Sequence, residues 1–177
     1  MPTMIQVARL KERIRDVADF PKKGIIFKDI TTLLKDGDSL KLVTDLLVEE
    51  ARKLDVDVVA GIESRGFIFA PLIANRLGVG FIPVRKKGKL PHKTVSVSYK
   101  LEYGMDSLEI HKDAINKGDR VLIIDDLLAT GGTANSVAKL VKKLGGSVAG
   151  FGFLVELTFL KGRKKLKNFP LFSLIQY

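Results

Sequence analysis

The stretch VLIIDDLLATGGT, residues 121–133, carries the pattern that decides the fold. Four apolar residues, 121–124, indicate a strand that is buried on both faces of a sheet. Two carboxylates, Asp125 and Asp126, follow at the carboxyl end of this strand, which is where open α/β sheets bind ligands. A turn of small residues then leads directly into a helical pattern. This order of strand, turn and helix predicts an α/β fold with a ligand site at the carboxyl edge of its sheet.

The turn after the strand has the composition of a phosphate-binding loop. It consists of Ala129, Thr130, Gly131, Gly132 and Thr133. Glycines let successive backbone N–H groups converge on an anion, threonines add hydroxyl donors, and the start of a helix carries roughly half a positive charge. Carboxylates such as Asp125 and Asp126 accept hydrogen bonds from ribose hydroxyls and also coordinate magnesium. We therefore predict a phosphate site beside either a sugar or a metal ion.

Two other nucleotide-binding classes share parts of this pattern. In a nucleotide hydrolase the two aspartates would be the metal-binding end of a strand, and the glycines would only begin a helix. Such a hydrolase needs a G-x-x-x-x-G-K-[ST] loop, which this sequence lacks. The sequence also lacks G-x-G-x-x-G, so a dinucleotide-binding fold is disfavoured.

The rest of the chain alternates strand and helix patterns. Short apolar runs rich in β-branched and aromatic residues predict further strands at 56–60, 79–84 and 148–155. Helical patterns at 67–77 and 133–144 each end at glycine. We therefore predict a parallel twisted sheet that is flanked by helices.

Two amphipathic helices and one hairpin complete the expected elements. Apolar spacing predicts helices at 4–20 and 39–54, the second capped by Asp38 or Ser39. Between 94 and 111 apolar and polar residues alternate until Gly104 interrupts the pattern. We interpret this segment as a β-hairpin or a long loop over one end of the sheet.

Composition limits the class of protein. The 177 residues are enough for one domain, and 46% hydrophobic with 28% charged residues is typical of a soluble globular protein. No apolar run approaches the length of a membrane span and no signal pattern begins the chain, so we expect a cytoplasmic protein without membrane contact. With no cysteine and two histidines, any metal would be held by oxygen atoms.

The net charge of +10 favours anionic partners, which include phosphorylated substrates, nucleic acids and acidic membrane surfaces. Two clusters carry much of this charge. The first is Arg85, Lys86, Lys87 and Lys89, and the second is Lys161, Arg163, Lys164, Lys165 and Lys167. For either cluster alone, the plainer interpretation is a solvated surface.

Residues 121–133 resemble the phosphoribosyl pyrophosphate signature of the type I phosphoribosyltransferases, and nearly the whole chain resembles the adenine-specific branch. Five further motifs occur in that branch's order and spacing: FPKKGIIFKDIT (20–31), GIESRGFIF (61–69), VRKKGKLP (84–91), YKLEYGMDSLEIHKDAI (99–115) and LVELTFLKGRKKL (154–166). Lys23 and Thr32 depart from the branch, which often has proline at both positions. The resemblance implies one phosphoribosyltransferase domain over 1–177, with residues 1–35 forming a small base-binding hood.

The resemblance also implies roles for the residues around phosphoribosyl pyrophosphate. Residues 129–133 would bind its 5-phosphate, and Asp125 and Asp126 would hold its ribose hydroxyls. Magnesium would be carried by this substrate, and the Glu63–Ser64 peptide bond would be cis. The residues that would bind the pyrophosphate group are Ser64, Arg65, Arg85, Lys86 and Lys89.

Further implied roles concern the base. Phe27 would stack on the purine, while Ile26 and Lys28 would offer backbone groups to its amino edge. Glu102 would take the proton from the purine, and Tyr103 would help close residues 94–110 as a lid over the site.

The resemblance implies an enzyme of purine salvage that converts adenine and phosphoribosyl pyrophosphate to AMP and pyrophosphate, working as a homodimer. Two alternatives remain open. One is a phosphoribosyltransferase for hypoxanthine, guanine or xanthine. The other is a nucleic-acid-binding regulator with the same fold, which the charge of +10 and the second basic cluster favour. Glu102 and the lid pattern argue against this regulator.

Overall fold

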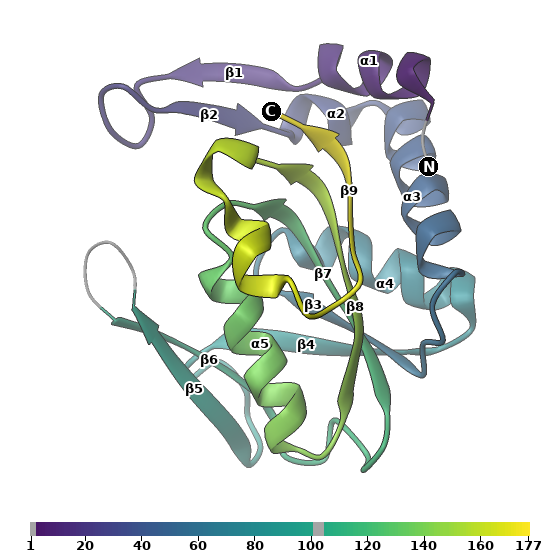
Figure 1. The fold of residues 1–177 in the computed structure, drawn as a ribbon, viewed down its shortest axis with the longest axis vertical. Coiled ribbons are helices and arrows are strands. Elements are labelled where there is room, and N and C mark those ends of the chain that lie inside the picture. The colour runs from purple at the N-terminus through teal and green to yellow at the C-terminus, as the bar shows by residue number, and fades with distance from the viewer. Residues whose placement is uncertain (1–2, 101–104) are drawn as a thin grey trace.

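The structure is a computed structural model that describes residues 3–100 and 105–177 (Figure 1). Within these residues the strands form two sheets, one of seven strands in the order β5-β6-β4-β3-β7-β8-β9 and one of two strands, β1-β2. The strands are β1 Arg15–Ala18, β2 Ile26–Asp29, β3 Val58–Ile62, β4 Gly80–Lys86, β5 Thr94–Lys100, β6 Met105–His111, β7 Arg120–Leu128, β8 Ser147–Glu156 and β9 Leu171–Gln176. The helices are α1 Met4–Glu12, α2 Thr31–Lys35, α3 Gly37–Ala51, α4 Gly66–Leu77 and α5 Gly132–Lys143, with 3-10 turns η1 Thr158–Leu160 and η2 Gly162–Leu166.

The large sheet is mostly parallel, as the alternation of strands and helices predicted. Strands β4, β3, β7, β8 and β9 pair in parallel. Strands β5 and β6 form an antiparallel hairpin, and β6 pairs with β4, the outermost parallel strand, through Arg85–Glu109 and Lys86–Leu108. Residues 94–100 and 105–111 therefore form the strands of a hairpin that extends the sheet, which is the first of the two predicted forms.

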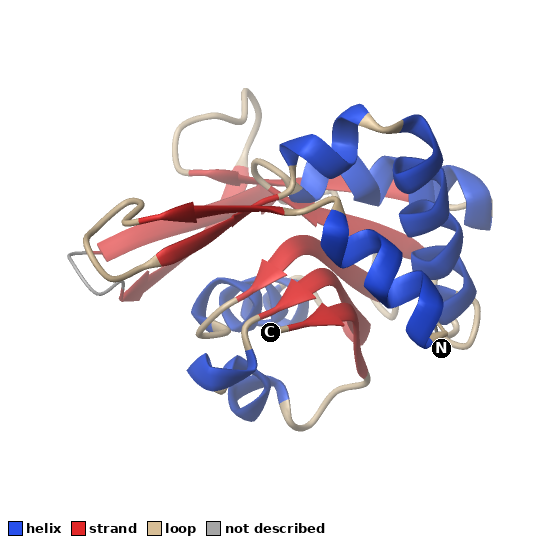
Figure 2. Cartoon of the chain, turned by 90° about the horizontal axis from the view of Figure 1, so that it is seen from above, coloured by secondary structure: helices blue, strands red, loops and turns tan. Residues whose placement is uncertain are grey.

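Helices cover both faces of the sheet and create two cores (Figures 1 and 2). Along β7, Leu122 and Ile124 pack with α3 and α4, whereas Val121 and Ile123 pack with α5. All four side chains are fully buried. Because successive strand residues point to opposite faces, a continuous apolar run is what such a central strand requires.

The predicted N-terminal helix is wrong in its second half. Helix α1 ends at Glu12, and residues 15–18 form β1, which pairs with β2. The apolar spacing that suggested a longer helix is satisfied by burial of Leu10 and Ile14. Beyond them, cross-strand ion pairs join Arg15 to Asp29 and Asp16 to Lys28, and these pairs favour the hairpin over another helical turn.

Smaller differences concern where elements begin and end. Helix α3 is capped by Asp36 rather than by Asp38 or Ser39, because the Asp36 carboxylate accepts hydrogen bonds from the backbone N–H and the hydroxyl of Ser39. Strand β7 continues through both aspartates to Leu128. Strand β9 and the two 3-10 turns were not predicted, because their sequences lack a clear repeat of apolar residues.

The two-stranded sheet lies across the end of the large sheet where β9 finishes (Figure 1). Its strand β2 contacts the C-terminal residue, because the Lys28 ammonium lies 4.0 Å from the centre of the Tyr177 ring. The N-terminal segment is therefore held against the edge that carries Asp125 and Asp126. Among the described helices, none has the length and apolar character to span a lipid bilayer.

Candidate active site

The glycine-threonine turn connects β7 to α5 and lines a small cavity of about 80 Å³. Gly131 precedes the first residue of α5 and has φ of +74°, a left-handed conformation that glycine adopts without strain. No acidic residue lies in the first turn of α5, all of which is described. The positive end of this helix therefore faces the cavity without a neutralising side chain of its own.

A larger cavity of about 530 Å³ adjoins the first, since Asp125, Leu127 and Thr133 line both. Its other lining residues come from the turn after β3, the end of β4 and the turn that follows it, the hairpin and β7. They are Glu63, Ser64, Arg65, Lys86, Lys89, Tyr99, Asp106 and Asp126. The structure thus brings together the predicted phosphate loop, both aspartates and four of the five predicted pyrophosphate residues.

The two aspartates differ in their surroundings. Asp126 is buried, and its Oδ2 lies 2.5 Å from Nε of Arg65. Asp125 accepts a hydrogen bond of 2.9 Å from the backbone N–H of Asp126. Burial, and then the nearby charge of Asp126, raise the pKa of Asp125. The site therefore contains one carboxylate, Asp126, that is paired with a cation, and beside it a second, Asp125, whose pKa is raised.

Helix α4 approaches the aspartates closely through a glycine. A Cβ on Gly66 would lie 2.7 Å from the carbonyl oxygen of Ile124 and 3.1 Å from Oδ1 of Asp125. A side chain at this position would push the Ser64–Arg65 turn away from β7. Glycine therefore lets Arg65 reach Asp126.

Glu63 lies between the predicted pyrophosphate residues. Its carboxylate accepts hydrogen bonds from the Lys86 backbone N–H at 3.0 Å, from Lys89 Nζ at 3.1 Å and from Arg85 Nε at 3.3 Å. Burial alone would raise the pKa of Glu63, but the hydrogen bonds from Lys86, Arg85 and Lys89 lower it to about 2. Its peptide bond to Ser64 is cis, as the resemblance implied.

Arg85 is the predicted pyrophosphate residue that does not line the larger cavity. Its guanidinium donates to Glu63 and, at 3.0 Å, to the carbonyl oxygen of Lys89. Arg85 therefore stabilises the turn that carries Lys89 without lining the cavity itself.

The hairpin contributes two side chains that sequence reasoning missed. Tyr99 and Asp106 lie opposite one another on β5 and β6, with the Tyr99 hydroxyl 3.4 Å from Asp106 Oδ2. Asp106 also lies 3.4 Å from the Lys86 ammonium. Burial is the main cause that raises the pKa of Tyr99. The predicted residues Glu102 and Tyr103 lie outside the described residues.

The predicted base-binding residues lie on β2. The Phe27 ring is 5.4 Å from the Arg65 guanidinium carbon and 5.2 Å from the Phe20 ring. The Lys28 ammonium pairs with Asp16 at 2.7 Å, and the Ile26 side chain is exposed. Phe27 is thus next to Arg65, although the two cavities do not extend to β2.

The carboxylate oxygens in the larger cavity fit a magnesium ion that is carried in by the substrate. Among the described residues, no three His, Cys, Asp or Glu side chains are grouped so that they could hold an ion by themselves. The larger cavity nevertheless presents carboxylates from Asp125 and Asp126. Magnesium in phosphate-transferring sites typically takes one or two carboxylates, with substrate oxygens and waters as its other ligands.

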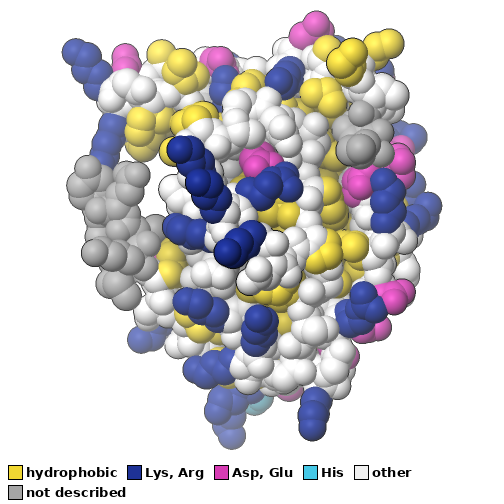
Figure 3. All heavy atoms as spheres, viewed as in Figure 1, with side chains coloured by type: hydrophobic (Ala, Val, Ile, Leu, Met, Phe, Trp, Pro, Cys, Tyr) yellow, Lys and Arg dark blue, Asp and Glu magenta, His cyan; other side chains and the backbone are white. Residues whose placement is uncertain are grey.

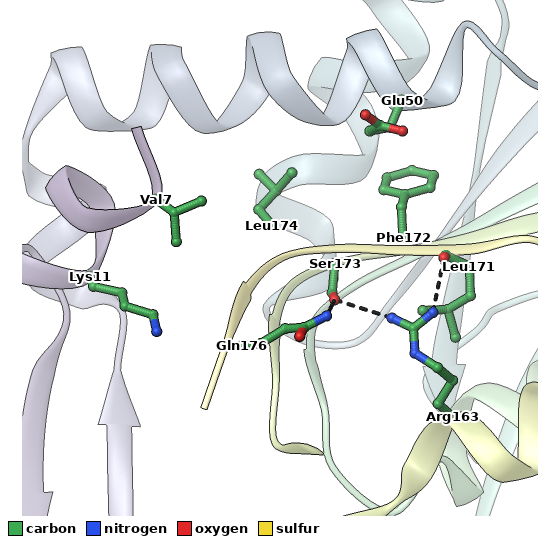
Figure 4. Close-up of a pocket in the computed structure, with 9 residues that line it drawn as sticks. All are labelled: Val7, Lys11, Glu50, Arg163, Leu171, Phe172, Ser173, Leu174 and Gln176. Carbon is green, nitrogen blue, oxygen red and sulfur yellow. Dashed lines mark hydrogen bonds between the residues drawn. The ribbon is translucent and has the colours of Figure 1, made fainter. Parts of the chain in front are cut away.

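Another cavity, of about 540 Å³, lies between α1, α3 and β9, away from these residues (Figure 4). Its lining includes Lys11, Glu50, Arg163 and Gln176 but none of the predicted site residues. Of these residues, Arg163 belongs to the 3-10 segment, residues 158–166, which comprises η1 and η2.

Known proteins resemble this chain over most of its length. The model of the phosphoribosyl transferase domain matches residues 29–170. An adenine phosphoribosyltransferase of Clostridium novyi (strain NT) is 58% identical over 168 residues, covering 95% of this chain and 98% of the relative.

Solved structures resemble the whole fold. The adenine phosphoribosyltransferase of Thermoanaerobacter pseudethanolicus has a TM-score of 0.94 at 54% identity, covering 97% of this chain and 99% of that one. The Saccharomyces cerevisiae enzyme, solved with an imino-altritol bisphosphate and adenine, has a TM-score of 0.90 at 40% identity over 97% of this chain and 99% of its own. This chain belongs to the phosphoribosyl transferase family and, within it, to the adenine phosphoribosyltransferases.

Proposed function

We propose that the chain makes AMP by transferring the phosphoribosyl group of phosphoribosyl pyrophosphate to adenine, with the 5-phosphate bound at residues 129–133. The observation that carries this placement is the small cavity at the amino end of α5, which opens beside Asp125 and Asp126. Backbone N–H groups at a helix start attract a phosphate. The two carboxylates would accept hydrogen bonds from the ribose hydroxyls.

The departing pyrophosphate would lie against the cationic side of the larger cavity. A ring nitrogen of adenine forms a bond to the anomeric carbon while the bond from that carbon to pyrophosphate breaks. Negative charge grows on the leaving oxygen, and cations fixed in place stabilise it most. Ser64, Arg65, Lys86 and Lys89 line this side, and Arg85 supports Lys89 from behind. Magnesium, when bound, supplies further positive charge to the pyrophosphate oxygens.

Residues 1–35 would form the base-binding hood. Phe27 on β2 lies 5.4 Å from Arg65, so a purine stacked on its ring would be next to the sugar site. Backbone groups of Ile26 and Lys28 would then read the amino edge of adenine. The yeast relative was solved with adenine bound, which supports the presence of a base site in this fold.

Glu102 would accept the proton that the purine releases, and Tyr103 would help residues 94–110 close over the reactants. Tyr99 and Asp106 form the second-last pair of β5 and β6 before residues 101–104. They line the cavity and would link such closure to the substrate. Closure excludes water, which would otherwise hydrolyse the reactive sugar. Homodimeric assembly and a cytoplasmic location stay predictions from the sequence.

Steady-state kinetics with magnesium and a panel of purines tests this function. We expect AMP from adenine, and much slower turnover of hypoxanthine, guanine and xanthine. Thr133→Ala should reduce kcat/KM by about a hundredfold because it removes a hydroxyl donor and loosens the phosphate loop. Preferred turnover of another purine would show that the base assignment is wrong, and an unaffected Thr133→Ala variant would show that the phosphate lies elsewhere.

The role of Glu102 needs a separate variant. Glu102→Gln should lower kcat by about a hundredfold while KM changes little, because general acid-base catalysis usually supplies at least that factor. A kcat within about twofold of the unchanged enzyme would remove Glu102 from the mechanism.

A further inference from the structure

We propose that the 3-10 segment, through Gly162 and the ion pair between Arg163 and Glu156, holds the phosphate loop in its binding shape. These residues are positioning residues, since they act through the loop and not on the substrate. The inference rests on the proposed binding of the 5-phosphate at 129–133. It also assigns a structural purpose to Arg163, one residue of the second basic cluster.

The first observation is direct contact between two backbones. A Cβ on Gly162 would overlap the carbonyl oxygen of Ala129 and would lie 3.0 Å from the backbone nitrogen of Gly131. A Cβ on Gly131 would lie 2.5 Å from the carbonyl oxygen of Gly162. The two glycines therefore pack against each other with no side chain between them. The loop cannot retreat from the phosphate position unless the 3-10 segment moves as well.

The second observation is the anchor of the 3-10 segment. Arg163 binds the Glu156 carboxylate with two hydrogen bonds, Nε to Oε1 at 3.0 Å and Nη2 to Oε2 at 2.5 Å. Glu156 is only 3% exposed and also accepts a 2.6 Å hydrogen bond from the Ser173 hydroxyl. Arg163 donates further to the carbonyl oxygen of Leu171 at 3.2 Å. Figure 4 shows this side chain reaching from η2 to β9.

The same segment is fixed at its other end by apolar packing. Leu166 is 1% exposed and belongs to the core that α5 shares with the sheet. The residue before Gly162 is Lys161, whose φ of +54° is uncommon for a residue other than glycine. A conformation of this kind persists where the surrounding contacts determine it. The Lys161–Gly162 backbone is therefore held in place by both anchors.

A loop that is already in its bound shape binds its ligand more tightly, because less conformational entropy is lost on binding. A displacement of about 1 Å in a positioned group can cost about a hundredfold in rate. Weakening the 3-10 segment should therefore lower the affinity for ligands that carry a 5-phosphate and leave the affinity for free adenine unchanged. This difference separates a positioning role from a general loss of stability.

Gly162→Ala tests the backbone contact. We expect KM for phosphoribosyl pyrophosphate to rise at least about tenfold and its kcat/KM to fall about a hundredfold. KM for adenine at saturating phosphoribosyl pyrophosphate should stay within about twofold, and calorimetry should show weaker AMP binding. The control is Gly37→Ala in the first turn of α3, where a Cβ meets nothing within 4 Å. The control should behave as the unchanged enzyme.

Arg163→Lys tests the anchor and carries the test if Gly162→Ala does not fold. Lysine keeps the positive charge but cannot form the two-pronged contact with Glu156. We expect AMP affinity and KM for phosphoribosyl pyrophosphate to weaken by about threefold to tenfold with KM for adenine unchanged. Unaltered AMP affinity in the folded variants, or an equal change in both KM values, would overturn the inference.

Thr133→Ala separates this inference from the proposed function. If Thr133→Ala weakens AMP binding while Gly162→Ala and Arg163→Lys do not, the phosphate site stands and the positioning role fails. If Thr133→Ala binds AMP normally, the phosphate site itself is wrong, and the inference fails with it.

Discussion

Asp126 and Arg65 illustrate how individual residues in this site balance one another's charge. The carboxylate is 8% exposed as a side chain and the guanidinium 40%, with 2.5 Å between Oδ2 and Nε. Pairing at this distance makes burial of the carboxylate tolerable. Both groups line the larger cavity, so each is available to a substrate that binds there.

Asp126→Asn should reduce kcat/KM by about a hundredfold to a thousandfold, because the amide keeps the shape but is a poorer acceptor for Arg65 and for ribose. Asp55→Asn is the matched control, since Asp55 forms an ion pair with Arg120 but is 83% exposed. Steady-state kinetics of both variants measures the difference. Equal activity in the two would contradict the placement of ribose at Asp126.

Glu63 predicts a dependence of stability on pH. Its pKa is about 2 in the folded state and 4.5 as the ordinary value, so the folded state binds this proton less readily. The stabilisation is fully present above pH 4.5 and is lost as pH falls through about 2. Urea unfolding of the unchanged protein and of Glu63→Gln should differ most above pH 4.5 and converge only as the pH falls to about 2. A pH-independent difference would argue against this assignment.

At the residue scale, the sequence could identify groups that lie in one continuous motif. Asp125, Asp126 and the predicted phosphate loop are adjacent along the chain, so strand and helix patterns were enough to locate them in the fold. Glu63 and Tyr99 were missed because their roles depend on which strands become neighbours. No local pattern indicates that Glu63 faces Arg85 across two paired strands.

At the scale of elements, one buried carboxylate holds the turn between β4 and β5. Oε1 of Glu109 accepts hydrogen bonds from the backbone N–H groups of Gly88, Lys89 and Leu90 at 3.0, 3.1 and 3.2 Å. Glu109 itself is 4% exposed and lies on β6. The hairpin therefore fixes the turn from which Lys89 enters the larger cavity.

Glu109→Ala should destabilise the protein by about 3 kcal/mol, because three backbone donors lose their acceptor. It should also raise KM for phosphoribosyl pyrophosphate, since Lys89 is no longer held. Glu109→Gln keeps a carbonyl oxygen and should lose less than half as much stability. Thermal unfolding and kinetics of both variants provide the check, and a stable Glu109→Ala variant with normal KM would refute this role.

Elements with a strong period were predicted well, and those fixed by tertiary contacts were not. The alternating residues of β5 and β6 and the apolar run of β7 do form strands. Each pattern matches the faces of the sheet that its strand buries. Strand β1 was mistaken for helix because ion pairs to β2 decide its conformation. The 3-10 segment depends on Glu156 and on the loop it contacts, neither of which its own sequence reveals.

At the scale of the whole molecule, positive charge dominates. The net charge is +10, and Lys and Arg side chains spread over the face that carries α5 and η2 (Figure 3). Because η2 adjoins the phosphate loop, this field should draw anionic substrate toward the site.

Salt should therefore slow capture of the substrate. Between about 0.05 and about 0.5 M potassium chloride, we expect kcat/KM for phosphoribosyl pyrophosphate to fall by about tenfold. KM for adenine, which is uncharged, should change little. Kinetics at several salt concentrations gives this result directly, and a flat profile would show that the charge serves another partner. Filter binding with duplex DNA and RNA at moderate salt then tests the nucleic-acid alternative, which predicts tight binding under those conditions.

The most direct test of the central claim is a crystal structure of the protein with AMP bound. The account predicts the phosphate of AMP against the backbone N–H groups of residues 130–133, with ribose hydroxyls at Asp125 and Asp126 and adenine on the Phe27 ring. A well-defined AMP molecule whose phosphate lies outside the loop, with residues 129–133 making no contact to it, would contradict the account.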